Sequence, residues 1–167
     1  MARLCFGRTN YNIRFESAVA IEGEEETLTD YGGLKLVGRE RNLNGTVYYA
    51  DDMTDEFEIS CDLFSLDHGI WIEMPYQIKS MKFCEFARKF FVKYVDPVNA
   101  NTNWPPTETD YCPLQKGVYW VKEWTPNTDS WVSYLRRGLV KLKYQIFKEG
   151  KVVGGMEFVA NIIDRGT

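Results

Sequence analysis

The residues that could carry out catalysis are few and widely spaced. The single histidine, His68, lies in a turn-like Asp-His-Gly stretch, and no motif for a serine or cysteine nucleophile accompanies it. The adjacent acids Asp51-Asp52 and Asp55-Glu56 fall near expected strand ends, where a solvated charge is the usual role. A carboxylate pair assembled from distant strands is the one catalytic arrangement that these residues leave open. We therefore expect a protein that is not an enzyme.

The four cysteines, Cys5, Cys61, Cys84 and Cys112, are the other reactive groups. Their even number fits two disulfides in a secreted protein and also fits four thiols in a reducing compartment. The absence of a Cys-x-x-Cys pair argues against a zinc site, and no motif indicates another metal or a cofactor. A bridge between Cys84 and Cys112 would close a loop of roughly thirty residues, which stabilises a fold by about 3–4 kcal/mol.

Length and composition fit one globular domain, residues 1–167, with an apolar core of its own. Ten Tyr, ten Phe and five Trp suit β-strands and apolar cavities. The first eighty residues carry fifteen acids and seven bases, and the remainder carry nine acids and thirteen bases. This pattern argues against a nucleic-acid partner and favours at most a transient contact between the basic half and an anionic membrane.

The elements that must position these groups are mainly strands. Alternation of apolar and polar residues predicts strands over residues 12–22, 34–37, 47–50, 56–64, 70–78, 118–124, 140–146 and 151–163. In the first strand this alternation places Val19 and Ile21 on the same face as Phe15. The Asn44-Gly45 pair predicts a hairpin turn between the second and third strands.

One helix is expected, from about Met81 to Val95. Phe83, Phe90 and Tyr94 recur at helical spacing, and Pro97 ends the pattern because the residue before a proline leaves the helical region. About eight strands, one helix and frequent turn signals together predict a β-sandwich or an open barrel.

Three segments carry a family likeness. FCEF at Phe83–Phe86, CPLQKGVYW at Cys112–Trp120, and Gly138 with the closing hairpin resemble the ganglioside activator branch of the ML lipid-recognition superfamily. The likeness covers residues 55–163 and is closest to the insect chemosensory B proteins and related insect domains of unknown function. The chain departs from the ganglioside activator in having fewer cysteines. It also has Leu135–Leu139 where that protein has a proline-and-tyrosine signal.

The resemblance implies an immunoglobulin-like β-sandwich that is opened into a β-cup, with an apolar cavity and one α-helix. It implies non-catalytic binding of a fatty acid, a long-chain hydrocarbon pheromone or a lipid tail, in lipid transport or in taste and pheromone detection. It also implies that Cys84 pairs with Cys112, which leaves Cys5 to pair with Cys61. Members of the superfamily are secreted or lysosomal. We expect a secreted protein, present as the mature form with a start methionine added.

In such a cup, inward residues near the mouth would contact the ligand. We expect the lining to comprise Phe57, Ile59, Ile72, Met74, Phe90, Trp120, Leu142, Tyr144 and Phe158. Trp104, Trp124 and Trp131 lie in or beside polar loops and are expected at the cavity mouth or at a membrane interface. Asn44 begins an Asn-Gly-Thr tripeptide and is a candidate glycosylation site.

The alternative function is that of a secreted interaction module. In that case the aromatic residues would fill a solid core, and the loops would bind a receptor or channel. Displacement of a fluorescent fatty acid would separate the two hypotheses.

Overall fold

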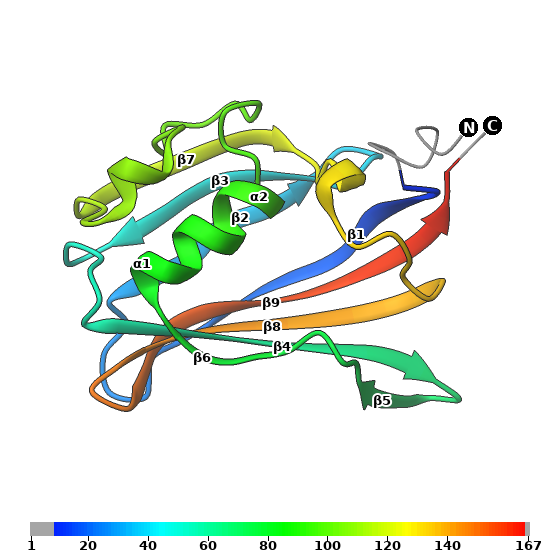
Figure 1. Cartoon of the computed structure of the whole chain (residues 1–167), viewed down its shortest axis with the longest axis horizontal. Helices are drawn as coiled ribbons and strands as arrows, with labels where there is room; N and C mark the ends of the chain where they lie inside the picture. Colours follow the sequence, from blue (N-terminus) through cyan, green and yellow to red (C-terminus); the bar gives the residue numbers. More distant parts are fainter. Residues whose placement is uncertain (1–8, 166–167) are drawn as a thin grey trace.

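The computed structural model describes residues 9–165 and has nine strands in one open sheet that folds over on itself (Figure 1). In chain order the elements are β1 (Tyr11–Ile21), β2 (Thr29–Val37), β3 (Asn42–Tyr49), β4 (Phe57–Asp67), β5 (Ile70–Glu73), β6 (Ile78–Lys82), α1 (Phe83–Phe86), the π-helical turn η2 (Ala87–Phe91), α2 (Val92–Tyr94), the short 3-10 helix η3 (Glu108–Tyr111), β7 (Gly117–Trp124), a second 3-10 helix η4 (Thr128–Ser130), β8 (Gly138–Lys148) and β9 (Lys151–Asp164).

The strands form two layers that meet along one side. Strands β4, β8, β9 and β1 lie side by side, with β5 and β6 on the outer edge of β4, while β2, β3 and β7 form the second layer (Figure 1). The layers join where Thr29 of β2 pairs with Gly154 of β9. A Cβ atom on Gly154 would lie 2.0 Å from the Thr29 carbonyl oxygen, so this close approach requires glycine. The expected mainly β fold, a sandwich opened into a cup, is confirmed.

One helical segment covers the open side between the layers (Figure 1). It runs without a break from α1 through η2 into α2, as the helical spacing predicted. It ends where Asp96 adopts a positive φ of 54° immediately before Pro97. The inner side of the helix is apolar: Phe83, Phe86 and Ala87 are buried in the core.

The C-terminal end of this helix is fixed by side chains from the end of β7 and from the segment that follows it. Ser130 Oγ donates to the Lys93 carbonyl at 2.9 Å, and the Trp131 and Trp124 indole N–H groups donate to the next two carbonyls, at 3.3 and 3.1 Å. The last carbonyls of a helix lack partners within the helix, so these three donors supply what the helix itself cannot. They hold α2 against the layer that contains β7.

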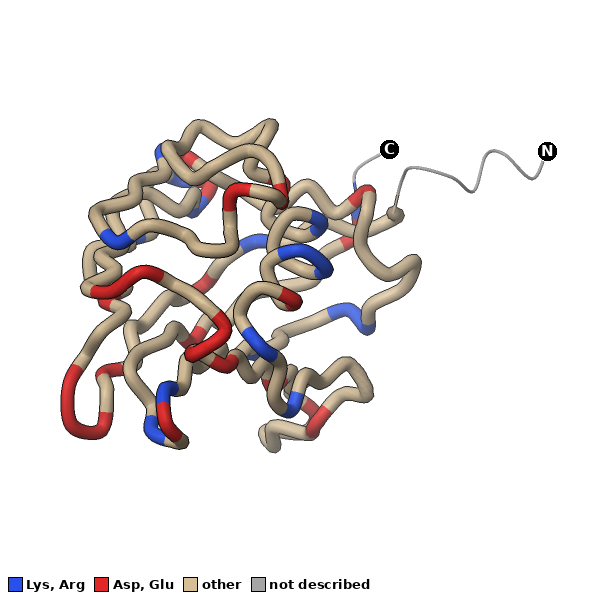
Figure 2. Tube along the Cα trace, turned by 60° about the vertical axis from the view of Figure 1, so that its left-hand side comes forward, with Lys and Arg blue, Asp and Glu red and all other residues tan. Residues whose placement is uncertain are grey.

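Lys, Arg, Asp and Glu residues occur along both layers and along the helix (Figure 2), and none of those within residues 9–165 lines the space between them. Arg88, Lys89 and Lys93 face solvent along the helix, and Lys89 pairs with Glu85 at 2.7 Å. The interior between the layers is left to apolar and aromatic groups.

Two local predictions were wrong. Strand β1 contains a β-bulge between Phe15 and Ser17, which shifts the register against β9 and reverses the faces beyond it. Val19 is therefore exposed, while Ala18 and Ala20 pack against the core.

The predicted hairpin turn at Asn44-Gly45 was also misplaced. The chain turns earlier, between Gly38 and Arg41, both of which have positive φ, and Asn44 and Gly45 lie within β3. Gly45 faces the backbone of Gly33, whose carbonyl oxygen would lie 2.0 Å from an added Cβ. This glycine allows two strands to approach closely and does not form the turn.

Candidate ligand-binding cavity

A cavity of about 510 Å³ lies between the two layers and the helix. This volume falls within the range of pockets that bury small ligands. Both layers contribute to its wall, as do the helix and the segments on either side of β7. The large side chains of the wall include Phe15, Leu34, Phe90, Phe91, Trp104, Trp124, Trp131, Leu142, Tyr144 and Phe158. Tyr76 also lines the cavity and is 46% exposed, so it marks the rim.

No charged residue lines the cavity within residues 9–165. Gln77 contributes an amide side chain to the wall, and its hydrogen bonds are made within the protein. Its Nε2 donates to the carbonyls of Leu63 and Met74 at 2.7 and 2.6 Å, and its Oε1 accepts from the Leu63 N–H at 3.1 Å. Gln77 therefore fixes the segment before β6 against β4 and leaves the wall almost entirely apolar.

Three tyrosines from both layers bring their hydroxyl groups together at the inner wall. The Tyr31 and Tyr49 hydroxyl oxygens are 2.9 Å apart, and the Tyr31 hydroxyl donates to that of Tyr144 at 3.3 Å. Burial raises the pKa of all three well above the ordinary value of 10.0, so the hydroxyls resist ionisation even in alkaline solution. We refer to Tyr31, Tyr49 and Tyr144 as the tyrosine triad.

The disulfide between Cys84 and Cys112 is present, as the family resemblance implied. It joins the start of α1 to the segment before β7, with Cα atoms 5.5 Å apart and a sequence separation of 28. A loop of this length supports the predicted stabilisation of about 3–4 kcal/mol. The bridge fixes the helix at its N-terminal end, as the three donors fix it at its C-terminal end.

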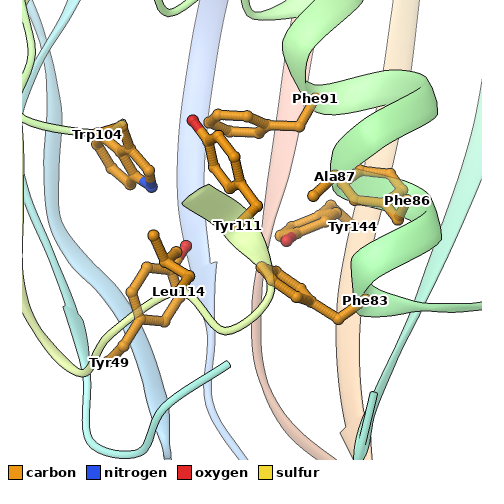
Figure 3. A pocket seen from close by; sticks show the side chains of 9 residues that line it. All are labelled: Tyr49, Phe83, Phe86, Ala87, Phe91, Trp104, Tyr111, Leu114 and Tyr144. Atoms are coloured by element: carbon orange, nitrogen blue, oxygen red, sulfur yellow. The ribbon is translucent and has the colours of Figure 1, made fainter. Parts of the chain in front are cut away.

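A small void of about 10 Å³ lies beneath the start of the helix (Figure 3). Phe83, Phe91, Tyr111 and Leu114 close around it, and Tyr49 and Tyr144 line both this void and the large cavity. The hydroxyl groups of these two tyrosines point toward the middle of the space (Figure 3). Tyr31 and Tyr49 of the triad are buried at the cavity wall, whereas Tyr76 is 46% exposed.

Four of the predicted lining residues, Phe90, Leu142, Tyr144 and Phe158, lie on the cavity wall. The three loop tryptophans Trp104, Trp124 and Trp131 also line it and are half-buried. Their rings face inward against the helix, and two of them donate hydrogen bonds to it. This placement favours the cavity over a membrane interface for these residues.

The remaining five predicted lining residues lie elsewhere. Phe57 and Ile59 have the predicted inward orientation on β4 but are fully buried in the packed core, because the layers close on each other there. Ile72 is 47% exposed on the short edge strand β5. Met74 packs against the margin of the core. Trp120 lies on the outer face of β7, where the Lys122 ammonium is 5.1 Å from its ring centroid.

The structure adds lining residues that the sequence reasoning missed. Tyr31 and Tyr49 are the most informative, because they bring polar groups into an apolar wall. The alternation of apolar and polar residues around Tyr49 could have indicated that its side chain faces inward. No such pattern surrounds Tyr31. Cys61 also lines the cavity and is a free cysteine. Its expected partner, Cys5, lies outside the described residues.

Three further features of residues 9–165 bear on function. Asn44 is half-buried within β3, and its Oδ1 accepts a hydrogen bond from the Glu123 N–H at 3.3 Å. No three His, Cys, Asp or Glu side chains in this range gather as metal ligands would. Nor does any helix in it have the length and apolar character needed to cross a membrane.

A comparison with protein-family models matches residues 62–145, which is half of the chain, to a family described as "Protein of unknown function (DUF1091)". The chain belongs to the DUF1091 family. The DUF1091 match begins in β4 and ends in β8, so it contains the helix, the disulfide and all three cavity tryptophans. It agrees with the expected likeness to a domain of unknown function. No curated protein matches the chain.

Proposed function

We propose that this protein binds a hydrophobic ligand in its cavity without catalysing a reaction. The observation that carries the proposal is a space of about 510 Å³ whose wall is apolar and contains no charged residue among those described. A packed β-sandwich has few voids larger than a water molecule, so a space of this size needs an occupant or a function. A solid-cored interaction module, the alternative function, would not contain it.

Burial of hydrocarbon supplies the binding free energy in this proposal. Each methylene removed from water contributes about 0.8 kcal/mol, so a linear chain of roughly ten carbons gains enough to exceed the cost of ordering it. Aromatic walls such as Phe90, Phe158 and Trp124 suit such a chain, because they present large apolar faces. The ligand class is therefore a long linear molecule such as a pheromone-like hydrocarbon derivative or a lipid tail.

We further propose secretion and membership of the ML lipid-recognition superfamily. The Cys84–Cys112 disulfide supports secretion, because disulfides persist mainly in oxidising compartments. The cup-like arrangement of two layers, with one helix over the open side, supports the superfamily relationship.

Filling the cavity tests the proposed function. Leu142 lines the cavity from β8, and Lys143 points to the opposite face of the same strand. We expect Leu142→Trp to weaken binding of the fluorescent probe N-phenyl-1-naphthylamine by about tenfold or more, because the indole occupies the ligand's space. Lys143→Trp serves as the matched control and should bind the probe like the wild type.

Circular dichroism and urea unfolding would first establish that both variants are folded. A wild-type protein that does not bind the probe or any long-chain ligand would overturn the proposed function. Equal binding by Leu142→Trp and the wild type would also contradict it, because the probe would then lie outside the cavity.

A further inference from the structure

The tyrosine triad has one hydrogen-bond donor for which residues 9–165 supply no acceptor. Three hydroxyl groups carry three donors, and the triad contains two hydrogen bonds. Since the Tyr31 hydroxyl donates to Tyr144, the 2.9 Å contact between Tyr49 and Tyr31 must have Tyr49 as its donor. The chain of donors therefore runs from Tyr49 through Tyr31 to Tyr144. The unused O–H belongs to Tyr144.

This free donor belongs to a residue that lines the proposed ligand space. Tyr144 lines both the large cavity and the small void beside it. Its hydroxyl points toward the middle of the side chains that surround the small void (Figure 3). Phe86 packs against the Tyr144 ring, with ring centroids 5.8 Å apart, and fixes its position from the helix side. An unused buried donor costs free energy, so an acceptor atom on a ligand would be favoured at this point.

The charge of that acceptor is restricted by the wall. No Lys, Arg or His among the described residues lines the cavity, and no Asp or Glu does so either. A carboxylate or an ammonium group at the triad would be buried without a counter-charge, which is strongly unfavourable. The three tyrosine hydroxyls are neutral at physiological pH, so the triad offers dipoles and no charge. A neutral oxygen meets both conditions.

Resting on the proposed function, we propose that the cavity selects a long-chain ligand with a neutral oxygen at one end, such as an alcohol, ketone or ester, and that the Tyr144 hydroxyl donates to this oxygen. The polar end lies at the tyrosine triad, and the hydrocarbon tail runs toward the rim at Tyr76. Free fatty acids, which are anionic at physiological pH, bind more weakly than alcohols of the same length.

A matched ligand series tests this proposal by displacement of N-phenyl-1-naphthylamine at pH 7. Tetradecanol, tetradecane and tetradecanoate have the same chain length and differ only at one end. We expect tetradecanol to bind at least about fivefold more tightly than either of the others, a difference of the size that one buried hydrogen bond makes. Tyr144→Phe should lower tetradecanol affinity about fivefold and leave tetradecane affinity unchanged.

Tyr48→Phe is the control, because Tyr48 lies beside Tyr49 in sequence but is 50% exposed on the outer face of β3. Equal affinities for the alcohol and the alkane, with no effect of Tyr144→Phe, would overturn the anchor and leave the proposed function intact. Tighter binding of tetradecanoate would overturn the requirement for a neutral end. Failure of the probe and all three ligands to bind would overturn both proposals.

Discussion

At the residue scale, Tyr31 is the centre of the buried polar chemistry. It contacts the hydroxyl groups of both Tyr49 and Tyr144, and its ring meets both of theirs edge-on, with centroids 6.1 and 5.7 Å apart. These contacts link β2, β3 and β8, so they join the two layers at the cavity wall. Ionisation of any member would place a negative charge in an apolar interior, which is why burial raises the pKa of each.

The raised pKa values predict that the protein is destabilised at alkaline pH. Below pH 10 the triad is neutral in both the folded and unfolded states and adds no pH dependence to the free energy of unfolding. Above pH 10 only the unfolded state ionises, so the folded state loses stability as pH rises, by about 1.4 kcal/mol per pH unit for each tyrosine. Urea unfolding at pH 8, 10 and 11 measures this loss.

Tyr31→Phe should make the loss between pH 10 and 11 smaller than in the wild type, and Tyr48→Phe should not. Ultraviolet difference spectra report tyrosinate directly. If all the tyrosines titrated near pH 10 while the protein stayed folded, the triad would not be buried as described.

Cys61 lies on the inward face of β4 and lines the cavity. Alternation along β4 correctly predicted that its side chain faces inward with Leu63, and both line the cavity. Burial raises the pKa of the Cys61 thiol from 9.0 to about 12, so it behaves as a small apolar group at neutral pH. The neutral Cys61 thiol therefore adds no charge to the cavity wall.

At the element scale, the helix is held at both ends and acts as a fixed cover. The disulfide secures Cys84 at its start, and side chains from the segment around η4 donate to its last carbonyls. The helix also stacks Phe90 between Phe86 and Tyr94, with centroid distances of 5.9 and 6.1 Å. The inner side of the helix is therefore an aromatic row along the cavity.

Removing one of the donors should loosen this cover. Trp124→Phe leaves the Val95 carbonyl without its indole partner, which costs about 1–2 kcal/mol of unfolding free energy. It should also increase amide hydrogen exchange in α2. Trp120→Phe makes the same chemical change on the outer face of the same strand and should have a smaller effect on both quantities.

Equal losses of stability in the two variants, with unchanged exchange in α2, would contradict a capping role for Trp124. Urea unfolding and hydrogen exchange by mass spectrometry provide the two readings.

The elements were largely predictable from the sequence, because each strand and the helix has its own apolar spacing. Details that depend on pairing between strands were not. The bulge at Phe15–Ser17 is set by the register of β1 against β9, and Gly45 serves a close approach to Gly33 that only the folded sheet creates. The spacing of apolar residues within one strand does not reveal which strand it pairs with or in what register.

The cavity was predictable as a feature of the family resemblance but not residue by residue. Alternation gives the face on which a side chain lies and does not give its depth between the layers. Phe57, Ile59, Cys61 and Leu63 share one face of β4, yet the first two are in the packed core and the last two line the cavity. The distance between the layers, which grows along the strands, decides the difference.

At the scale of the whole molecule, two layers joined at one side and bridged by a helix leave a space that their side chains do not fill. The junction at Thr29 and Gly154 holds the layers together, and the helix closes the opposite side. No charged residue within residues 9–165 lines this space, and the tyrosine triad places three hydroxyl groups at its wall. The molecule is thus an open two-layer sheet around a space whose described lining residues carry no charge.

Native mass spectrometry of the protein tests this account most directly. The protein would be extracted with organic solvent, refolded by dilution into buffer and incubated with tetradecanol. We predict a single population with one tetradecanol per chain, which Leu142→Trp does not form. No retained ligand in the wild type, or the same complex in Leu142→Trp, would contradict the claim that the cavity is a ligand-binding site.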